Sequence, residues 1–306
     1  MIFTSIKSGL TQVCSNKRMV LVYYLANLLF GLLLMLPFRT MLNKFIGHSL
    51  MGEKLAGRMD MDFFFDFFKH NPNFFSTYAG LILIIPAIYW LISLFLSGGA
   101  LSVFASGEKY TSALFWGNAA KYFGRFIRLV LMSIPVFIIL FCLPFLLNLI
   151  QRIFFGSDPY QYITHWGGWI KVGLRYISII LYFIVLDYAR IHAVTTDDHR
   201  MRISLWQGIK FGFGNFLKTF GLALILFAAG IIALIIYNPI ADLLHAPLTI
   251  VIILLFVWQQ VYMFFRMMVR LTLYAGEARL YHVICSREEA ENVSTEDNLG
   301  VDGAIT

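Results

Sequence analysis

Six stretches of the chain are apolar over the length that a helix needs to cross a lipid bilayer. They are residues 19–36, 77–96, 127–150, 176–194, 220–237 and 248–271. A transmembrane helix needs about 20 predominantly apolar residues. Hydrophobic residues make up 59% of the chain and charged residues 13%, an apolar excess that no soluble core could bury. We therefore predict an all-α integral membrane protein with six transmembrane helices.

The lysines and arginines predict how these helices are oriented. Sixteen of the 24 lie in the N-terminal segment, in the second and fourth connections and in the C-terminal segment, and eight lie on the other side. Cytoplasmic connections are enriched in these residues, so both termini are expected in the cytoplasm. The net charge of +7 is therefore attributed to topology, and no nucleic-acid partner is predicted.

A recurring order of features suggests that the transmembrane part consists of three units. Each unit begins with an aligned glycine, continues to an asparagine or glycine and a basic residue, and reaches a proline at the end of an odd-numbered span. These positions are Gly9, Asn16 and Pro37, then Gly117, Gly124 and Pro144, then Gly208, Asn215 and Pro239. We predict two-span repeats over residues 1–107, 108–198 and 199–285. An alternative stays open, because aromatic and basic residues before any span look alike.

Helices at the membrane surface are also expected. The segments 111–124 and 204–215 predict amphipathic helices at the cytoplasmic interface, with Trp116 and Trp206 at the membrane surface. Residues 60–70 mix charges with phenylalanines, which predicts a helix along the outer interface. Residues 286–306 are polar and acidic and predict a disordered cytoplasmic tail, which leaves residues 1–285 as the transmembrane domain.

Polar side chains inside the predicted spans mark a candidate site, because a charge in the bilayer is costly without a partner. The candidates for ligand binding or ion pairing are Asp187, Arg190, Arg266, Arg270, Gln259 and Ser97. Gln259, Arg266 and Arg270 of the sixth span share a face by their spacing, and the repeat places Ser97, Asp187 and Arg266 at similar depth. Asp187 is expected at salt-bridge distance from Arg190, Arg266 or Arg270.

Two interpretations of this polar group stay open. The residues could line a cavity near the cytoplasmic face that accepts an anionic headgroup or a solute. Alternatively, they could form an ion pair that orients the helices, with the arginine side chains reaching the inner interface.

The order of residues around Asp187 also carries a resemblance. Asp187-Tyr188-Ala189-Arg190 leads to Leu205-Trp206-Gln207-Gly208, and Asn215 precedes the fifth span. This layout resembles uncharacterised bacterial six-span membrane proteins with three two-helix repeats. It is more loosely similar to the membrane domains attached to some bacterial glycerophosphodiester phosphodiesterases. The resemblance implies a bacterial cytoplasmic (inner) membrane and an involvement with lipids. It does not imply phosphodiesterase activity, because no such catalytic domain is present.

Three classes of function follow from these observations. The leading hypothesis is a non-enzymatic membrane protein that handles lipids or solutes, or serves as a subunit of a larger membrane complex. Its expected partners are membrane lipids and other membrane proteins. The alternative is a small transporter or channel with its polar site near the cytoplasmic face. An intramembrane enzyme ranks third, because no zinc-protease, P-loop or nucleophile-elbow motif occurs. We expect no catalytic residues, no metal site and no cofactor.

Overall fold

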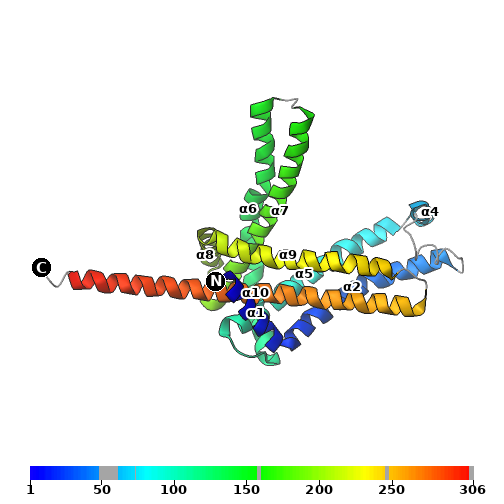
Figure 1. The fold of residues 1–306 in the computed structure, drawn as a ribbon. Helices are drawn as coiled ribbons and strands as arrows, with labels where there is room; N and C mark the ends of the chain where they lie inside the picture. The colour runs from blue at the N-terminus through cyan, green and yellow to red at the C-terminus, as the bar shows by residue number, and fades with distance from the viewer. Residues whose placement is uncertain (48–60, 73, 157–159, 245–247, 303–306) are drawn as a thin grey trace. The chain divides into compact units, whose positions relative to one another are not determined.

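The computed structural model describes residues 1–47, 61–72, 74–156, 160–244 and 248–302 (Figure 1). Within these ranges every regular element is a helix. The helices are α1 (Ile2–Ser15), α2 (Lys17–Ile46), α4 (Met61–His70), α5 (Phe74–Ser106), α6 (Ser112–Phe155), α7 (Gln161–Thr195), α8 (Met201–Gly214), α9 (Phe216–Leu243) and α10 (Thr249–Asp302). An all-α chain agrees with the physical requirement that every backbone polar group in a bilayer be hydrogen-bonded within its own segment.

Six of the described helices are long and apolar enough to cross a membrane. The candidate spans are Lys17–Ile46, Tyr78–Ser106, Ser112–Phe155, Gln161–Thr195, Phe216–Leu243 and Thr249–Arg287. Their most apolar windows have mean hydropathies of 1.8 to 2.8, and at most 22% of any window is buried inside the protein. Each span overlaps one apolar stretch of the sequence. The prediction of six spanning helices is therefore confirmed, and their exposed apolar surface is what lipid would cover.

An asparagine separates two of the spans from the helix that precedes each of them. Asn16 separates α1 from α2 with φ −109° and ψ 46°, and Asn215 separates α8 from α9 with nearly the same values, −113° and 35°. No such break occurs in α6, which runs without interruption through the segment 111–124. From the sequence, that segment is predicted to be a separate interfacial helix. The structure differs because Gly124 stands at the position aligned with Asn16 and Asn215, so no asparagine side chain competes with the helical hydrogen bonds there. The resulting helix of 44 residues is about 66 Å long.

The C-terminal segment also differs from expectation. Helix α10 continues to Asp302, through most of the residues for which the sequence predicts a disordered tail. The residues just after Ser286 are arginine, glutamate and alanine, all of which have high helix propensity. Because α10 is already formed, these residues extend an existing helix and need no new nucleus.

The chain divides into two compact units. Unit 1 contains Met1–Ser15, Ser97–Leu226 and Thr272–Thr306, and unit 2 contains Asn16–Leu96 and Phe227–Leu271. In unit 2 the expected outer helix is present as α4, and its Phe63 and Phe67 are buried in an aromatic cluster with Phe45 and Phe74. Phe63 and Phe67 of α4 therefore pack against the protein.

Unit 1 is held together by close helix crossings at small residues. A Cβ atom added at Gly9 of α1 would lie 2.9 Å from the backbone nitrogen of Gly276 in α10. One added at Gly208 of α8 would lie 2.7 Å from the backbone nitrogen of Ala189 in α7. In α5, a Cβ at Gly99 would lie 2.6 Å from the carbonyl oxygen of Phe115 in α6. Small residues let helix backbones approach closely, which is the usual packing mode of membrane helices.

Candidate functional site

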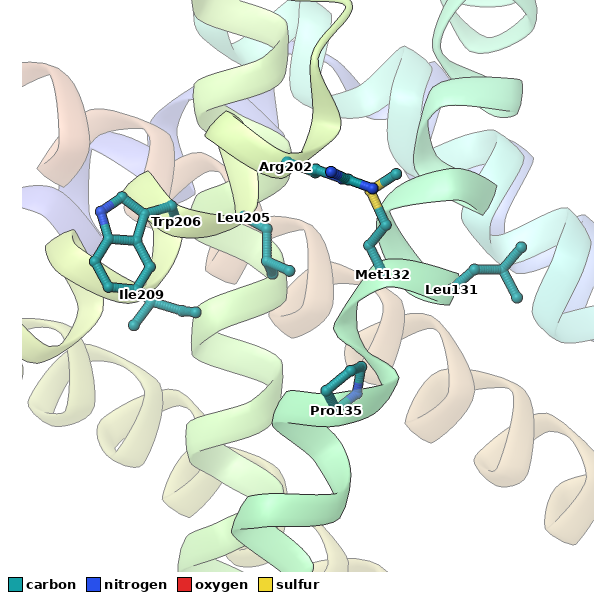
Figure 2. A pocket seen from close by; sticks show the side chains of 7 residues that line it. All are labelled: Leu131, Met132, Pro135, Arg202, Leu205, Trp206 and Ile209. Atoms are coloured by element: carbon teal, nitrogen blue, oxygen red, sulfur yellow. The ribbon is translucent and has the colours of Figure 1, made fainter.

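A groove between α6 and α8 is the first feature of unit 1 that could hold a ligand. Its apolar part is a hollow of about 270 Å³ (Figure 2). The lining residues are Leu131, Met132 and Pro135 from α6 and Arg202, Leu205, Trp206 and Ile209 from α8. Pro135 lacks a backbone N–H, so it cannot donate to the carbonyl of Leu131 one turn earlier. The wall of the groove is thus apolar, with one locally weakened helix turn.

A second hollow, of about 300 Å³, continues the groove toward the α7–α8 connection. Its lining residues are Arg128 and Met132 from α6 and His199, Arg200, Met201, Arg202 and Ile203 around the start of α8. Met132 and Arg202 line both hollows, so the two are adjacent. The walls of both hollows are mostly apolar, and the second differs in having Arg128, Arg200 and Arg202 around it, so we call it the basic hollow and its end of the groove the basic end.

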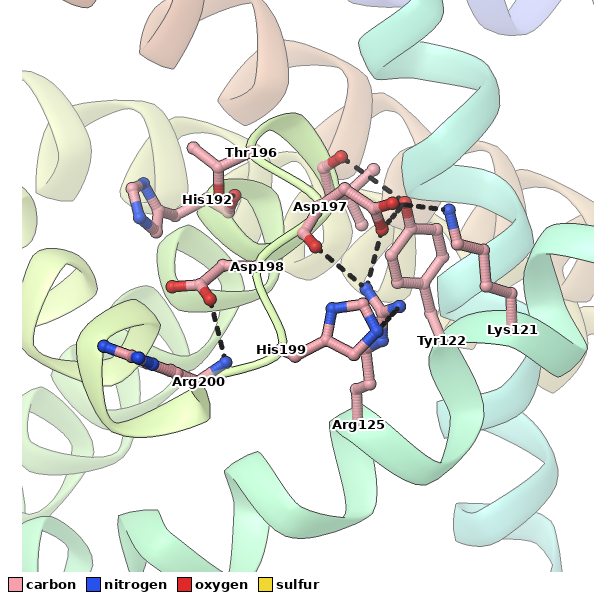
Figure 3. Close-up of polar contacts among 10 residues, drawn as sticks. Lys121, Tyr122, Arg125, His192, Thr196, Asp197, Asp198, His199 and Arg200 are labelled. Carbon is pink, nitrogen blue, oxygen red and sulfur yellow. Dashed lines mark hydrogen bonds and ion pairs between the residues drawn. The ribbon is translucent and has the colours of Figure 1, made fainter.

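The basic end is positioned by an ion-pair network around Asp197, which we call the Asp197 network (Figure 3). Asp197 Oδ2 lies 2.9 Å from Lys121 Nζ, and Asp197 Oδ1 lies 2.7 Å from Arg125 Nη1. The Tyr122 hydroxyl donates to Asp197 Oδ1 at 3.3 Å. Arg125 Nη2 also donates to His199 Nε2 at 2.9 Å. These bonds attach the turn between α7 and α8 to α6, and so they hold the first residues of α8 beside Arg128.

The backbone and charge of Asp197 suit this role. Its φ of 51° is the one positive value among the described non-glycine residues, and aspartate tolerates this left-handed conformation better than most side chains. Hydrogen bonds from Lys121 and then Arg125 lower the pKa of Asp197 from 3.8 to about 2. The carboxylate is therefore ionised at neutral pH and neutralises one of the two positive charges beside it.

A second polar group lies inside unit 1, between α7 and α10. Arg190 Nη1 lies 2.9 Å from Asp187 Oδ1, so the expected ion pair of Asp187 with Arg190 is present. Glu277 of α10 is within electrostatic range of both residues, and only 1% of its surface is exposed. The guanidinium of Arg190 also lies over the ring of Phe126, 5.8 Å from its centroid. We call Asp187, Arg190 and Glu277 the buried triad.

The buried triad is incompletely hydrogen-bonded. Among the described residues, Glu277 Oε2, Arg190 Nε and the Tyr188 hydroxyl are buried and have no hydrogen-bond partner. A buried polar atom in this condition costs free energy unless a water, an ion or a ligand completes it. The triad can therefore serve either as a structural centre with internal water or as a polar binding site.

The remaining residues predicted from the sequence lie in different surroundings. Ser97 is fully buried in unit 1. Gln259, Arg266 and Arg270 belong to unit 2, where Gln259 and Arg266 are exposed. The guanidinium of Arg270 lies 5.9 Å from the ring centroid of Tyr23. The structure thus joins Asp187 to Arg190, and whether any of the six residues binds a ligand stays a prediction.

Several residues of the groove were not recognised as site candidates from the sequence. From the sequence, Arg128, Arg200 and Arg202 serve only to predict topology. One signal was available, because Arg200 and Arg202 lie just before the predicted helix 204–215, where acidic residues are preferred. Glu277 is not among the residues predicted for the site from the sequence. Its place beside Asp187 depends on how two distant helices cross, and no local pattern predicts that.

Comparisons with protein-family models, with curated proteins and with solved structures find no match to this chain. Among the described residues, no group of three or more histidine, cysteine, aspartate or glutamate side chains could hold a metal ion.

Proposed function

We propose that this polytopic membrane protein is a non-enzymatic lipid-handling protein that binds a phospholipid of the inner leaflet in the groove between α6 and α8. The observation that carries the proposal is the adjacency of two mostly apolar hollows that share Met132 and Arg202, one of which has the exposed side chains of Arg128, Arg200 and Arg202 around it. A phospholipid has the same division into an acyl part and a phosphate-bearing part. Basic pockets between membrane helices on the cytoplasmic side suit anionic lipid headgroups.

The orientation of the chain supports this assignment. The basic end of the groove lies at the α7–α8 connection, on the side that the lysine and arginine distribution assigns to the cytoplasm. Trp206 is 67% exposed at the apolar hollow, and indole rings favour the membrane interface. An inner-membrane location with both termini in the cytoplasm belongs to the same proposal, as does α8 lying in the inner interface.

The proposal includes three two-span units, supported by the helix crossings of unit 1. The carbonyl of Ser5 lies 3.7 Å from a Cβ built at Gly276, and the carbonyl of Phe115 lies 2.6 Å from one built at Gly99. On the basis of these contacts we align Gly99 of α5 with Gly276 of α10, and Ala189 of α7 is the corresponding residue of the remaining unit. The matching small residues of the packed helices are then Gly9, Ala119 and Gly208. The sequence aligned Gly117 with Gly9 and Gly208, but no atom lies within 4 Å of a Cβ added at Gly117. We therefore shift the alignment of this unit by two residues, to Ala119.

This alignment of the three units changes which polar residues correspond. The residues two positions before Gly99, Ala189 and Gly276 are Ser97, Asp187 and Tyr274. Tyr274 therefore takes the place that was assigned to Arg266 from the sequence alone. One residue forward, Arg190 and Glu277 become equivalent. The buried triad would then lie where the cytoplasmic ends of the even-numbered spans meet.

A transporter is the second candidate, and the buried triad is the observation that favours it. Buried ionisable residues in membrane helices often mark pathways for ions or solutes. Under this alternative, Asp187→Asn should abolish uptake of the transported ion or solute into reconstituted vesicles, while the groove between α6 and α8 still binds phospholipid. Under the leading proposal, Asp187→Asn should affect stability alone.

The leading proposal is tested by filling the groove. Ile209 is half-buried in the apolar hollow, and Ile209→Trp adds a bulky side chain there. Ile138 on α6 is 54% exposed outside the groove, so Ile138→Trp is a matched control. Both variants and the wild-type protein would be purified in a neutral detergent and examined by native mass spectrometry after addition of an equimolar mixture of dioleoyl phospholipids.

We expect wild-type protein and Ile138→Trp to retain one tightly bound phospholipid that Ile209→Trp loses. Thermal unfolding of all three proteins would establish that the variants are folded. Equal retention by the two variants, or no retention by the wild-type protein, would contradict a lipid site in the groove.

A further inference from the structure

We propose that the basic end of the groove is a selective site for a doubly charged phosphate headgroup, that of a phosphomonoester lipid such as phosphatidate. The inference rests on the proposed function and specifies its ligand. It concerns Arg128, Arg200 and Arg202, which all line the basic hollow and are all exposed.

The positive charges of this hollow are not neutralised by the protein. Asp197 is bound to Lys121 and Arg125, which lie on the other side of the turn. Within the described ranges, no carboxylate lies at salt-bridge distance from Arg128, Arg200 or Arg202. The remaining nearby carboxylate, Asp198, accepts a hydrogen bond from the backbone nitrogen of Arg200 at 2.9 Å. Three guanidinium groups against one carboxylate leave about two positive charges at this end of the groove, and the Asp197 network adds about one more because Lys121 and Arg125 share one carboxylate.

Two of these arginines lie at the N-terminus of α8, where the single carboxylate of Asp198 must balance the helix charge and both guanidinium charges. Arg200 is the N-cap of α8, no side chain caps this end, and the first turn contains no acidic residue. By contrast, Thr111 caps the start of α6 by accepting a hydrogen bond from the backbone nitrogen of Leu114. The N-terminus of a helix carries a partial positive charge, which disfavours basic residues there. A bound phosphate would offset both the helix charge and the guanidinium charges.

The groove itself indicates that the phosphate belongs to a lipid. Arg202 and Met132 line the apolar hollow as well as the basic one, so an anion held by Arg202 lies directly beside Leu205 and Ile209. Figure 2 shows Leu205 and Ile209 on α8 facing the side of the groove formed by Met132 and Pro135. A free phosphate would occupy the basic hollow and leave the apolar one to water. A phospholipid fills both with matching chemistry.

The charge balance distinguishes between classes of phospholipid. A phosphodiester headgroup brings one negative charge, whereas a phosphomonoester carries about 1.5 to 2 negative charges at pH 7, because its second pKa is about 6. Guanidinium groups bind phosphate oxygens in a bidentate manner, and a phosphomonoester offers three such oxygens. An excess of at least about two positive charges therefore favours the phosphomonoester over the phosphodiester.

The test compares four ligands on the same purified protein. Native mass spectrometry in a neutral detergent would measure binding of dioleoyl phosphatidate, phosphatidylglycerol, phosphatidylcholine and inorganic phosphate, at pH 7.5 and at pH 5. Arg202→Gln removes a guanidinium shared by both hollows. Lys210→Gln removes an exposed charge of the same helix outside them and is the matched control. Thermal unfolding would verify that both variants are folded.

We expect phosphatidate to bind roughly tenfold more tightly than phosphatidylglycerol at pH 7.5, because one charge-assisted hydrogen bond is worth about a factor of ten. This preference should shrink at pH 5, where the headgroup loses its second charge. Arg202→Gln should remove the preference, while Lys210→Gln keeps it.

Each contrary result has a separate meaning. Equal binding of phosphatidate and phosphatidylglycerol would overturn the selectivity for a doubly charged headgroup. Equal binding of phosphatidylcholine would overturn the headgroup site and leave the lipid groove standing. Binding of inorganic phosphate as tight as that of phosphatidate would assign the site to free anions. If Arg202→Gln and Lys210→Gln lost the preference for phosphatidate equally, the preference would be due to general surface charge. Failure of every lipid to bind would overturn the proposed function as well.

Discussion

Adding one methyl group at Gly208 should separate helices α7 and α8. A Cβ atom at this position would lie 2.7 Å from Ala189 Cβ, from the Ala189 backbone nitrogen and from the Val185 carbonyl oxygen. Carbon atoms in favourable contact are about 3.5–4.0 Å apart, so the methyl group is too close by about 1 Å. Two of the three atoms belong to the backbone and cannot rotate away. The helices must therefore move apart, and the close packing beside Tyr188 and Phe211 is loosened.

The magnitude follows from two opposing effects. Inserting a methyl group into a well-packed interior costs about 1–3 kcal/mol. Replacing glycine with alanine inside a helix returns about 0.8–1 kcal/mol through helix propensity. Gly117→Ala provides the matched control, because it has the same propensity gain and no atom lies within 4 Å of the added Cβ. The propensity effect cancels in the comparison, so Gly208→Ala should be about 1–3 kcal/mol less stable than Gly117→Ala.

The assay is reversible unfolding by a denaturing detergent in mixed micelles, followed by far-ultraviolet circular dichroism. Gly208→Ala should unfold at a lower denaturant fraction than the wild-type protein, and Gly117→Ala at an equal or higher fraction. If the two variants shift together, α7 and α8 do not cross at Gly208 as described. Gly208→Val should extend the trend, because its larger side chain meets the same backbone atoms.

Two further perturbations probe charged groups of unit 1. Asp187→Ala removes the hydrogen-bonded partner of Arg190 and leaves Glu277 as the remaining acidic member of the buried triad, so it should lower the free energy of unfolding by about 3–5 kcal/mol. The triple variant Asp187→Leu/Arg190→Leu/Glu277→Gln should recover most of this loss in the same assay, and a triple variant as unstable as the single one would contradict the pairing. The pKa of Asp197 is lowered to about 2, so the stability it contributes is complete above its unfolded-state pKa of about 3.9 and is lost as the pH falls through about 2. Thermal unfolding between pH 5 and pH 2 should therefore show a larger loss of stability in the wild-type protein than in Asp197→Asn, and parallel curves would exclude this role of Asp197.

The number and type of the principal helices follow from the sequence alone. A segment of about 20 apolar residues has few alternatives to a helix, because its backbone must satisfy its own hydrogen bonds in lipid. The same local logic gave Arg190, three residues further along the same helix, as one of three possible partners of Asp187, and the structure selects it. The breaks at Asn16 and Asn215 were also marked by residue type, since asparagine competes with helical hydrogen bonds through its own side chain.

The groove and the buried triad were decided by the tertiary structure. Arg128 lies beside Arg200 and Arg202 because Asp197 attaches the α7–α8 turn to α6, and this attachment joins residues more than 70 positions apart. Glu277 meets Asp187 and Arg190 because α10 packs within unit 1. Likewise, Ala119 and not Gly117 occupies the packed face of α6, because the crossing with α5 selects that side. Helix periodicity defines which residues share a face, but the partner of that face depends on crossing angles and close approaches that only the assembled helices possess.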